Sequence, residues 1–349
     1  MRAYDVIIVG AGPIGIELAV ALKRAGVDYA QVEAGSVGQT LTWWAPQTRF
    51  FSSPERIEIA GVPLVGVAQE KATREEYLAY LRAVVTQFDL EIAQHETVTS
   101  IAREGIGEAG VFTLGTESRA GGRMRRARRV VLAIGDMHRP RMLGIPGEDL
   151  AHVSHYFQDP HRFFRQRVVI VGGKNSAVEA AIRCHRVGAR VTLAYRGSEI
   201  SERVKYWLRP ELMALFKTGA IEFLPRVTPT AITPRDVRFE RGGGRGEIEV
   251  AADFVLLMTG YEQDTTLLEM AGVALEGEGR KPHHNPRTME TNVPGLYLAG
   301  TAAAGTQLHG VKVFIETAHV HVTRVVASLT GRDVRDEEIA DTEYVLPES

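Results

Sequence analysis

Two short apolar runs, each followed by glycines and a helix-like pattern, dominate the hydrophobic pattern of the chain. Residues 5–10, DVIIVG, are β-branched and almost continuously apolar, as in a strand buried on both faces of a parallel sheet. Apolar positions at helical spacing follow over 16–25, and Gly26 is suited to end that helix. A second run, YAQVE, ends at Glu33. This β–α–β order predicts a Rossmann-like unit.

The same pattern returns at residue 167, in RVVIVGGKNSAVEAAIRCHRVGARVTLAYRG. A strand over 168–171 meets glycines, a helix extends to about Val187, Gly188 ends it, and the strand RVTLAYR follows. Two such units in 349 residues predict an α/β protein with two dinucleotide-binding domains.

The first unit carries a full glycine motif. Gly10 is expected to make the tight turn, Gly12 to admit a pyrophosphate near the backbone, and Gly15 to let helix and strand pack closely. Ala11, Pro13 and Ile14 fill the motif's remaining positions. Glu33, at the end of the second strand, is placed to accept a ribose hydroxyl. This indicates an adenine dinucleotide without a 2′-phosphate, and FAD is the dinucleotide that we expect.

The second unit departs from this motif in two places. Lys174 replaces the second glycine, in a turn made by Gly172, Gly173, Lys174, Asn175 and Ser176. Arg196 stands where the first unit has an acid, and an arginine there accommodates a 2′-phosphate. The second unit is therefore predicted to bind NADP, with a solvated strand-end arginine as the alternative for Arg196.

The remaining segments predict one domain inserted into the other. Apolar strands that reach a glycine and a polar stretch occur at 130–148 and 254–264, as expected of two connections between domains. We expect an FAD domain of residues 1–138 and 262–349 and an NADP domain of 139–261. Near the end, a strand in LYLAG precedes a helix over 311–329, whose N-terminus is expected to point at the flavin.

Composition excludes several other classes. The net charge of −2 gives no global field for nucleic acid or membrane surfaces, and the basic run 123–129 is interpreted as a solvated hairpin. The single cysteine, Cys184, fits a reducing compartment, so we expect a cytoplasmic enzyme. His283 and His284 suggest no third ligand, so they are interpreted as a loop and no metal is expected.

The motifs carry a family resemblance. The chain resembles the thioredoxin-reductase-like flavoproteins of the YpdA type, a group of bacillithiol disulfide reductases. The resemblance lies in the double nucleotide motif and in four segments: TRFFSSPERIEIAGVP (48–63), VVIVGGKNSAVEAA (168–181), MTGY (258–261) and METNVPGLYLAG (289–300). The resemblance spans almost the whole chain. It implies electron flow from NADPH through FAD to a small disulfide, and an enzyme that forms homodimers. It also adds candidate cofactor-binding residues: Gln39, Thr48, Ala133, Gly135, Gly300 and Val313.

Two departures from the resemblance concern thiols. Thioredoxin reductases carry a CxxC motif, which this chain lacks, and the YpdA-type group is expected to have a cysteine where Ile14 stands. Cys184 shares a helical face with Ala177, Ala180 and Ala181 and is expected in the core. The flavin then reduces a small acceptor without a protein thiol, and we assign no catalytic residue.

Further side chains are candidates for the flavin surroundings. Trp43 and Trp44 are expected to line the ring system, and Phe50 to Ser53 to continue that wall. For both groups the alternative is packing in a core or an interface. His309 is a candidate proton or hydrogen-bond donor. His155 and Tyr156 follow the first connection and have a structural role as the alternative. Two other functions stay open: a flavin monooxygenase, suggested by MTGY, and a redox sensor that binds FAD and NADPH without turnover.

Overall fold

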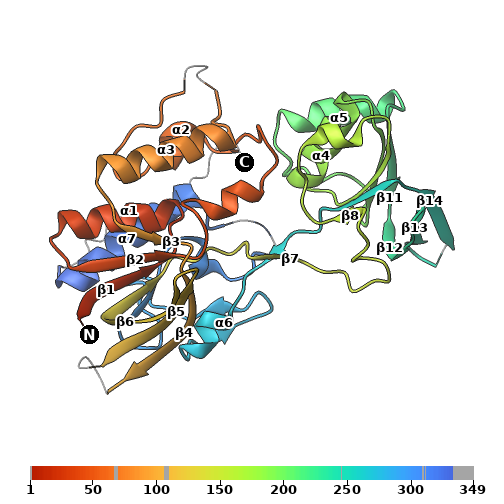
Figure 1. Ribbon diagram of the computed structural model, residues 1–349. Coiled ribbons are helices and arrows are strands. Elements are labelled where there is room, and N and C mark those ends of the chain that lie inside the picture. Colours follow the sequence, from red (N-terminus) through yellow and green to blue (C-terminus); the bar gives the residue numbers. More distant parts are fainter. Residues whose placement is uncertain are drawn as a thin grey trace. The chain divides into compact units, whose positions relative to one another are not determined.

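The computed structural model describes residues 2–66, 70–105, 110–244, 246–308, 310 and 312–332, which form two compact units. Of these residues, the first contains 2–42, those within Gln47–Arg139, and those from Tyr261 to residue 332. The second contains Pro140–Gly260 and also the short segment Trp43–Pro46. Each unit has its own sheet, which contains the parallel strands of one of the two glycine-rich β–α–β segments (Figure 1).

The first unit has a mixed sheet in which β6 is shared by two parts. Parallel strands lie in the order β3-β2-β1-β6, and β19 pairs with β6 as well. The long β6 continues into an antiparallel meander with β5 and β4. The bounds are β1 Ala3–Val9, β2 Tyr29–Glu33, β3 Ile92–Gln94, β4 Thr97–Glu104, β5 Val111–Ser118, β6 Gly121–Leu132 and β19 Leu296–Leu298. The short β17 Leu275–Glu276 and β18 Lys281–Pro282 pair with each other.

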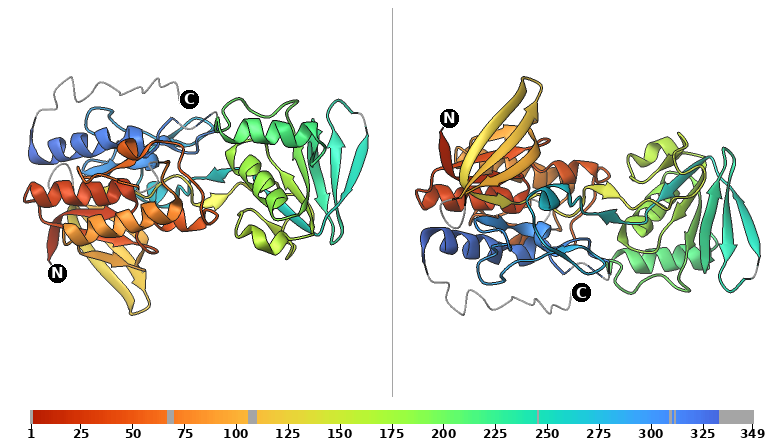
Figure 2. Two further views of the ribbon diagram at one scale, coloured as in Figure 1. Left: turned by 90° about the horizontal axis from the view of Figure 1, so that it is seen from above. Right: turned by 90° about the horizontal axis from the view of Figure 1, so that it is seen from below.

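Helices cover one face of this sheet. Helix α1 contacts α3 and α7, and the three lie side by side (Figure 2). Residues 6–9 of β1 are buried, which agrees with a strand covered on both faces. At the start of α3, Thr73 and Glu76 form a capping box. The helices are α1 Pro13–Arg24, α2 Pro54–Ile57, α3 Arg74–Gln87, α6 Thr266–Met270 and α7 Ile315–Thr330, with the 3₁₀ turns η1 Gln39–Trp43 and η4 Gly300–Ala304.

The second unit is a parallel sheet between helices and a small antiparallel sheet. Strands lie in the order β11-β10-β9-β15-β8. Along β9, Val168 and Ile170 join a core with the helices, while Val169 and Val171 join a core with the three-stranded sheet. This alternation explains the continuous apolar run. The elements are β8 Val153–Ser154, η3 Pro160–Phe163, β9 Arg167–Val171, α4 Asn175–Arg186, β10 Arg190–Tyr195, α5 Leu208–Lys217, β11 Ile221–Pro225, β12 Val227–Ile232, β13 Asp236–Arg241, β14 Glu247–Ala251 and β15 Phe254–Leu257.

The chain passes between the units through two short strands that pair with each other. They are β7 Arg139–Pro140 and β16 Tyr261–Glu262. The side chains of Arg139 and Glu262 approach to 3.7 Å. Both ends of the inserted segment therefore leave the first unit together.

Two predicted helix boundaries are wrong. Helix α1 begins at Pro13 rather than at residue 16, because Gly12 is its N-cap and proline suits the first helical turn. Helix α7 begins at Ile315 rather than at 311. The Gln307 side-chain oxygen accepts the backbone N–H groups of Lys312 and Val313, which holds that segment in a loop.

Three helices of the first unit meet at His319. Its Nδ1 lies 2.7 Å from a Glu17 carboxylate oxygen of α1, and its Nε2 lies 3.0 Å from the Arg56 carbonyl oxygen of α2. Burial opposes the charged imidazole, but the hydrogen bond and charge of Glu17 outweigh it, so the pKa of His319 is raised. The charged ring therefore ties α7 to α1 and α2.

We predict that His319→Gln destabilises the protein more at about pH 6 than at about pH 9. A raised folded-state pKa gives stability that is present in full below the unfolded pKa and is lost as pH rises through the folded pKa. Chemical denaturation should show a penalty of about 1–2 kcal/mol at the lower pH and a smaller one at the higher pH. A penalty that grows with pH would contradict the charged state.

Candidate functional site

The first glycine turn combines two closed positions with one open position. A Cβ on Gly10 would lie 2.4 Å from the Ala133 carbonyl oxygen, and a Cβ on Gly15 would lie 2.4 Å from the Gly10 carbonyl oxygen. Gly10 also has a φ of +111°. A Cβ on Gly12, in contrast, would meet no atom within 4 Å. Gly10 and Gly15 thus serve packing, and the open side at Gly12 suits a phosphate approaching the start of α1.

Glu33 is held at the edge of the same turn. Its Oε2 accepts the backbone N–H of Ala11 at 2.7 Å, and its Oε1 accepts that of Gly35 at 2.8 Å. Each oxygen has a second lone pair, so the carboxylate can still accept ribose hydroxyls. The nearby Gln31, which sequence reasoning missed, donates to the Gly10 carbonyl oxygen at 2.9 Å and supports the turn.

Three strands bring further candidates to this edge of the sheet. Ala133 follows β6, and its N–H donates to the Val9 carbonyl oxygen of β1 at 2.8 Å. Gly300 follows β19, and a Cβ there would lie 3.3 Å from Ile14 Cβ. Gly135 and Gly300 have φ values of +82° and +71°, which glycine adopts freely. The carboxyl ends of β1, β6 and β19 thus form one candidate FAD site, with Ile14 inside it.

A partly buried polar network behind this edge was not predicted. Gln263 donates to the carbonyl oxygens of Gly135 at 3.1 Å and Ala302 at 2.9 Å. Gln307 donates to Asp136 Oδ2 at 2.9 Å. Burial raises the pKa of Asp136, against the hydrogen bonds from Gln307 and Thr301. All of these residues lie in or beside quoted motifs, but a motif does not show that a glutamine is buried.

Three further candidates lie in loops around this edge and form hydrogen bonds with backbone or side-chain groups there. The Gln39 side-chain oxygen accepts the Ser36 N–H at 3.0 Å in the loop after β2. The Thr48 carbonyl oxygen accepts the Arg74 N–H at 2.8 Å. Val313 precedes α7, and its N–H donates to Gln307 at 3.0 Å. His309, the candidate proton donor, lies outside the described residues.

The second glycine turn is arranged in a similar way. A Cβ on Gly172 would lie 2.7 Å from the Met258 carbonyl oxygen, and one on Gly173 would lie 2.5 Å from the Tyr195 ring. Lys174 is the N-cap of α4 and is exposed, as is Ser176. Asn175 accepts the Lys205 N–H at 2.8 Å. The two exposed side chains therefore border a helix N-terminus, which suits a phosphate.

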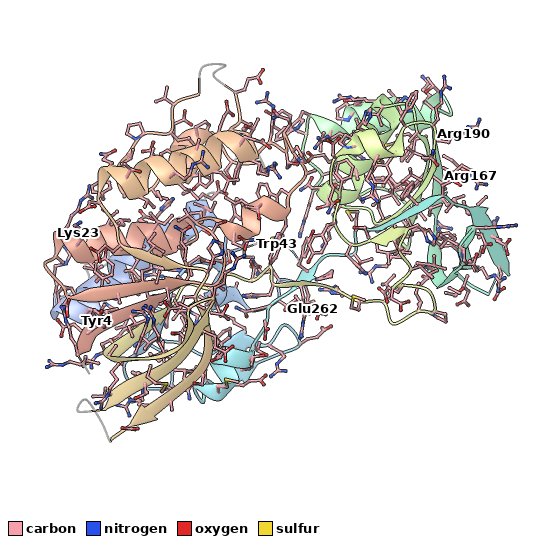
Figure 3. All side chains as sticks on the ribbon, in the orientation of Figure 1. Tyr4, Lys23, Trp43, Arg167, Arg190 and Glu262 are labelled. Atoms are coloured by element: carbon pink, nitrogen blue, oxygen red, sulfur yellow. The ribbon has the colours of Figure 1, made fainter. Side chains whose placement is uncertain are left out.

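Arg196 lies directly after β10, beside this turn. Its side chain is exposed, and it pairs with no acidic group in the described part of the chain. Arg190 and Arg167, by contrast, are neighbours at the N-terminal ends of β10 and β9, the ends away from the glycine turn (Figure 3). Arg167 is also engaged by Asp253 at 2.6 Å. Arg196 is thus the arginine that follows β10 at its glycine-turn end, whereas Arg190 begins the strand.

The aromatic candidates separate into two environments. The ring centroids of Trp43 and Tyr156 lie 6.0 Å apart, and both residues belong to the second unit. Phe50 is 1% exposed and packs on Tyr77 at 4.6 Å in the first unit. Because Phe50 is fully enclosed by protein, it belongs to the core, the alternative to lining the flavin. Trp44 and Phe51, with Ser53, follow in the same loops, and Ser52 is buried.

The histidine and cysteine candidates have structural surroundings. His155 Nε2 lies 3.3 Å from Glu148, and burial lowers the pKa of His155. His283 contacts Glu276 at 2.7 Å, and His284 contacts the Pro282 carbonyl oxygen at 2.9 Å. Among the described residues, no three His, Cys, Asp or Glu side chains are placed to hold a metal ion.

Cys184 lies in the helix-side core of the second unit, as predicted. It is fully buried, and burial raises the pKa of its thiol to about 12. A buried, protonated thiol is not a redox nucleophile.

Comparisons with known proteins agree with this arrangement. The family model of the pyridine nucleotide-disulphide oxidoreductases matches residues 7–300. The chain belongs to this family. Bacilliredoxin reductase Bdr of Bacillus subtilis is 36% identical over 327 residues, which is 94% of this chain and 98% of that protein. The solved bacillithiol disulfide reductase Bdr (YpdA) of Bacillus cereus is 33% identical with a TM-score of 0.88, covering 95% and 100% of the two chains.

The family membership confirms several predictions. The resemblance to the YpdA-type reductases and the two Rossmann-like, thioredoxin-reductase-like units are confirmed. The chain is an NAD(P)H-dependent flavoprotein oxidoreductase, with FAD and NADPH as its cofactors. A ferredoxin–NADP reductase of Ignicoccus hospitalis is also similar, at 28% identity over 85% of this chain and 89% of that protein. All three relatives are named reductases, so the monooxygenase alternative is not favoured.

No helix in the described part of the chain is long and apolar enough to cross a membrane.

We predict that Gly12→Ala and Gly15→Ala fail for different reasons. An alanine at 12 has space in the protein and an ordinary φ of −74°, so it should fold but lose FAD. An alanine at 15 overlaps the Gly10 carbonyl oxygen, so it should also unfold more easily, by roughly 1–3 kcal/mol. Flavin absorbance per protein and denaturation of the FAD-free proteins separate the two. Full FAD occupancy in Gly12→Ala would refute the phosphate position.

Proposed function

We propose that this chain transfers electrons from NADPH through FAD to a small disulfide of the bacillithiol-disulfide type. The observation that carries the proposal is the complete glycine turn, with Glu33, Gly135 and Gly300 around it, in a chain that spans nearly the whole length of two reductases named for bacilliredoxin and bacillithiol disulfide. We assign FAD to residues 1–138 and 262–349 and NADP to residues 139–261. We also expect a cytoplasmic homodimer.

The residues fit FAD at the first turn. Gly12 and the N-terminus of α1 would hold the pyrophosphate, and Glu33 would hold the ribose hydroxyls. The raised pKa of Asp136 reflects a site with little water behind Gly135. When bound, the flavin supplies two-electron chemistry between a nicotinamide and a disulfide. Overall, NADPH, a proton and one disulfide become NADP⁺ and two thiols.

Ile14 decides how the disulfide is reduced. It is 6% exposed in the first turn of α1 and next to Gly300, where the YpdA-type group is expected to have a cysteine. Cys184 cannot replace that thiol, because it is buried in the second unit. We infer that no mixed disulfide with the protein forms and that electrons pass from the flavin to the substrate directly.

Ile14 also permits a second class of electron acceptor. An isoleucine at this position suits one-electron transfer to an iron–sulfur protein, which needs no protein thiol. The ferredoxin–NADP reductase of Ignicoccus hospitalis, similar over 85% of this chain, supports a ferredoxin as this acceptor.

Anaerobic stopped-flow absorbance tests the acceptor. NADPH should bleach the flavin rapidly, and bacillithiol disulfide should restore its absorbance. Reoxidation by ferredoxin alone would favour the second acceptor. Reoxidation by neither would overturn both proposals.

We predict that Ile14→Cys accelerates reoxidation by the disulfide, because a thiol divides the reaction into two easier steps. Ile14→Ser is the matched control, since serine has a similar size but no thiol. The cysteine variant should exceed the serine variant at least about tenfold, or about 1.4 kcal/mol. Equal rates for the two variants would show that the disulfide does not reach residue 14.

We predict that Arg196→Gln raises KM for NADPH about tenfold or more and leaves KM for NADH unchanged, because a charge-assisted contact to the 2′-phosphate is lost. Arg190→Gln, at the far end of the same strand, is the control and should change neither value. Steady-state kinetics with both nucleotides provide the measurement. Equal losses with NADPH and NADH would remove Arg196 from the 2′-phosphate site.

A further inference from the structure

One backbone hydrogen bond closes the glycine turn of each unit and shows how the two units correspond. In the first unit, the Gly10 N–H donates to the Val32 carbonyl oxygen of β2 at 2.8 Å. In the second unit, the Gly172 N–H donates to the Ala194 carbonyl oxygen of β10 at 2.9 Å. Val32 and Ala194 therefore hold equivalent positions, and so do the residues that follow them in the chain.

Tyr195 is the residue that corresponds to Glu33. Each directly follows the strand residue whose carbonyl group closes the turn. Arg196, which the sequence pattern placed where the first unit has an acid, lies one residue further along the chain. The second unit thus has an aromatic ring where the first has a carboxylate, and its arginine is a further change beside the ring.

The Tyr195 ring lies between two glycines. A Cβ on Gly173 would lie 2.5 Å from ring atoms Cδ2 and Cε2, and a Cβ on Gly197 would lie 2.4 Å from Cε1 on the opposite edge. The ring fits here because neither residue carries a side chain. Tyr195 remains partly exposed, so the ring is fixed at the glycine turn without being enclosed by protein.

The Glu33 carboxylate lies between the two corresponding residues of the first unit. Its oxygens accept the N–H groups of Ala11 at 2.7 Å and Gly35 at 2.8 Å. Ala11 follows the first glycine of its turn by one residue, as Gly173 does, and Gly35 follows the strand end by two residues, as Gly197 does. The ring therefore fills in the second unit the place that the carboxylate fills in the first.

The exchange of a carboxylate for a ring changes the charge next to a bound ribose. A carboxylate accepts a 2′-hydroxyl but repels a 2′-phosphate, because both groups are negative. The Tyr195 ring is uncharged, and the exposed Arg196 guanidinium follows it directly. A 2′-phosphate would thus meet an attraction from Arg196 that no carboxylate at position 195 offsets.

We propose that Tyr195 is a specificity-determining residue for NADPH, because its ring occupies the place of the ribose-binding carboxylate and removes the charge that would exclude a 2′-phosphate. This inference rests on the assignment of NADP to the second unit. It also predicts how the preference can be reversed. A glutamate at position 195 would have the N–H groups of Gly173 and Gly197 at the places of the two donors that hold Glu33.

Titration calorimetry of the FAD-loaded, full-length protein tests the proposal with two probes that lack a nicotinamide and cannot reduce the flavin. Adenosine 2′,5′-bisphosphate represents the adenosine end of NADPH, and adenosine 5′-monophosphate represents that of NADH. The wild-type protein should bind the bisphosphate at least about tenfold more tightly, as expected of one charge-assisted contact. Equal affinities would overturn the NADP assignment, and this inference with it.

Tyr195→Glu should lower the preference for the bisphosphate at least about tenfold relative to Tyr195→Gln, which has the same size without the charge. The preference of Tyr195→Gln should stay within about threefold of wild type, since both probes lose the same ring. Flavin content and chemical denaturation check that each variant folds, and Tyr195→Asp provides the test if Tyr195→Glu does not.

Two results would overturn the inference while leaving the NADP assignment intact. One is a wild-type preference that survives in Tyr195→Glu. The other is an equal loss of preference in Tyr195→Glu and Tyr195→Gln, because the missing ring, and not the charge, would then be the cause.

Discussion

The structure of the first unit depends on backbone atoms approaching where no Cβ fits. Gly10 packs against the Ala133 carbonyl oxygen, and Gly15 against the Gly10 carbonyl oxygen. In each case a Cβ on the glycine would lie only 2.4 Å from that oxygen. These contacts bring α1, β1 and β6 together at one edge. They also direct the open side of Gly12 and the helix N-terminus toward the same space, so packing and phosphate binding share one constraint.

A partly buried hydrogen-bond network extends this edge to the last part of the chain. Gln263 connects the Gly135 and Ala302 carbonyl oxygens, and Gln307 connects Asp136 to the segment before α7. Because the Gln263 amide is buried and would be costly to leave unbonded, its two contacts favour a single arrangement of distant segments. The position where α7 begins is a consequence of this network, and with it the direction in which the helix dipole acts.

Ile14 distinguishes this candidate site from that of the YpdA-type group, which is expected to have a cysteine at this position. The residue is buried in the first turn of α1 and beside Gly300, so it is inside the cofactor site rather than on the surface. An apolar side chain there preserves packing but supplies no nucleophile. In the proposed reaction, nucleotide binding and flavin reduction rest on backbone geometry, whereas the acceptor step depends on the side chain at position 14.

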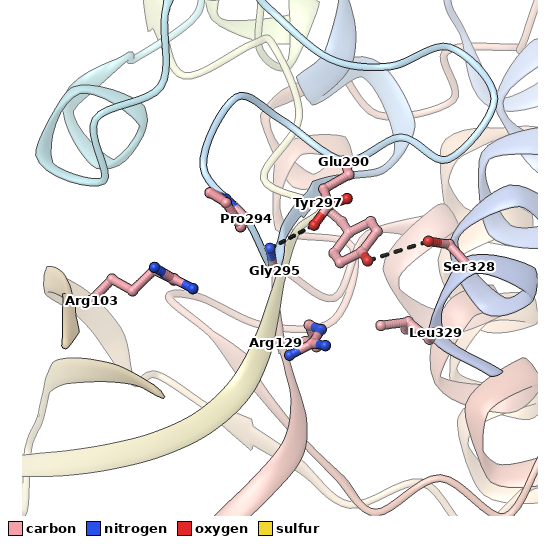
Figure 4. A pocket seen from close by; sticks show the side chains of 8 residues that line it. All are labelled: Arg103, Arg129, Glu290, Pro294, Gly295, Tyr297, Ser328 and Leu329. Carbon is pink, nitrogen blue, oxygen red and sulfur yellow. Dashed lines mark hydrogen bonds between the residues drawn. The ribbon is translucent and has the colours of Figure 1, made fainter. Parts of the chain in front are cut away.

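The sequence by itself determined the two nucleotide units, because glycine spacing, strand burial and helical periodicity are local properties of the chain. It also determined that Cys184 belongs to a core, since its neighbours at helical spacing are alanines. It did not show that Phe50 is enclosed by protein, or that Gln307 delays the start of α7. Those outcomes depend on contacts between residues far apart in the chain. A polar cavity of the first unit, lined in part by Arg103, Arg129, Tyr297 and Ser328 (Figure 4), is of the same kind, because it forms only where β4, β6, β19 and α7 meet in the fold.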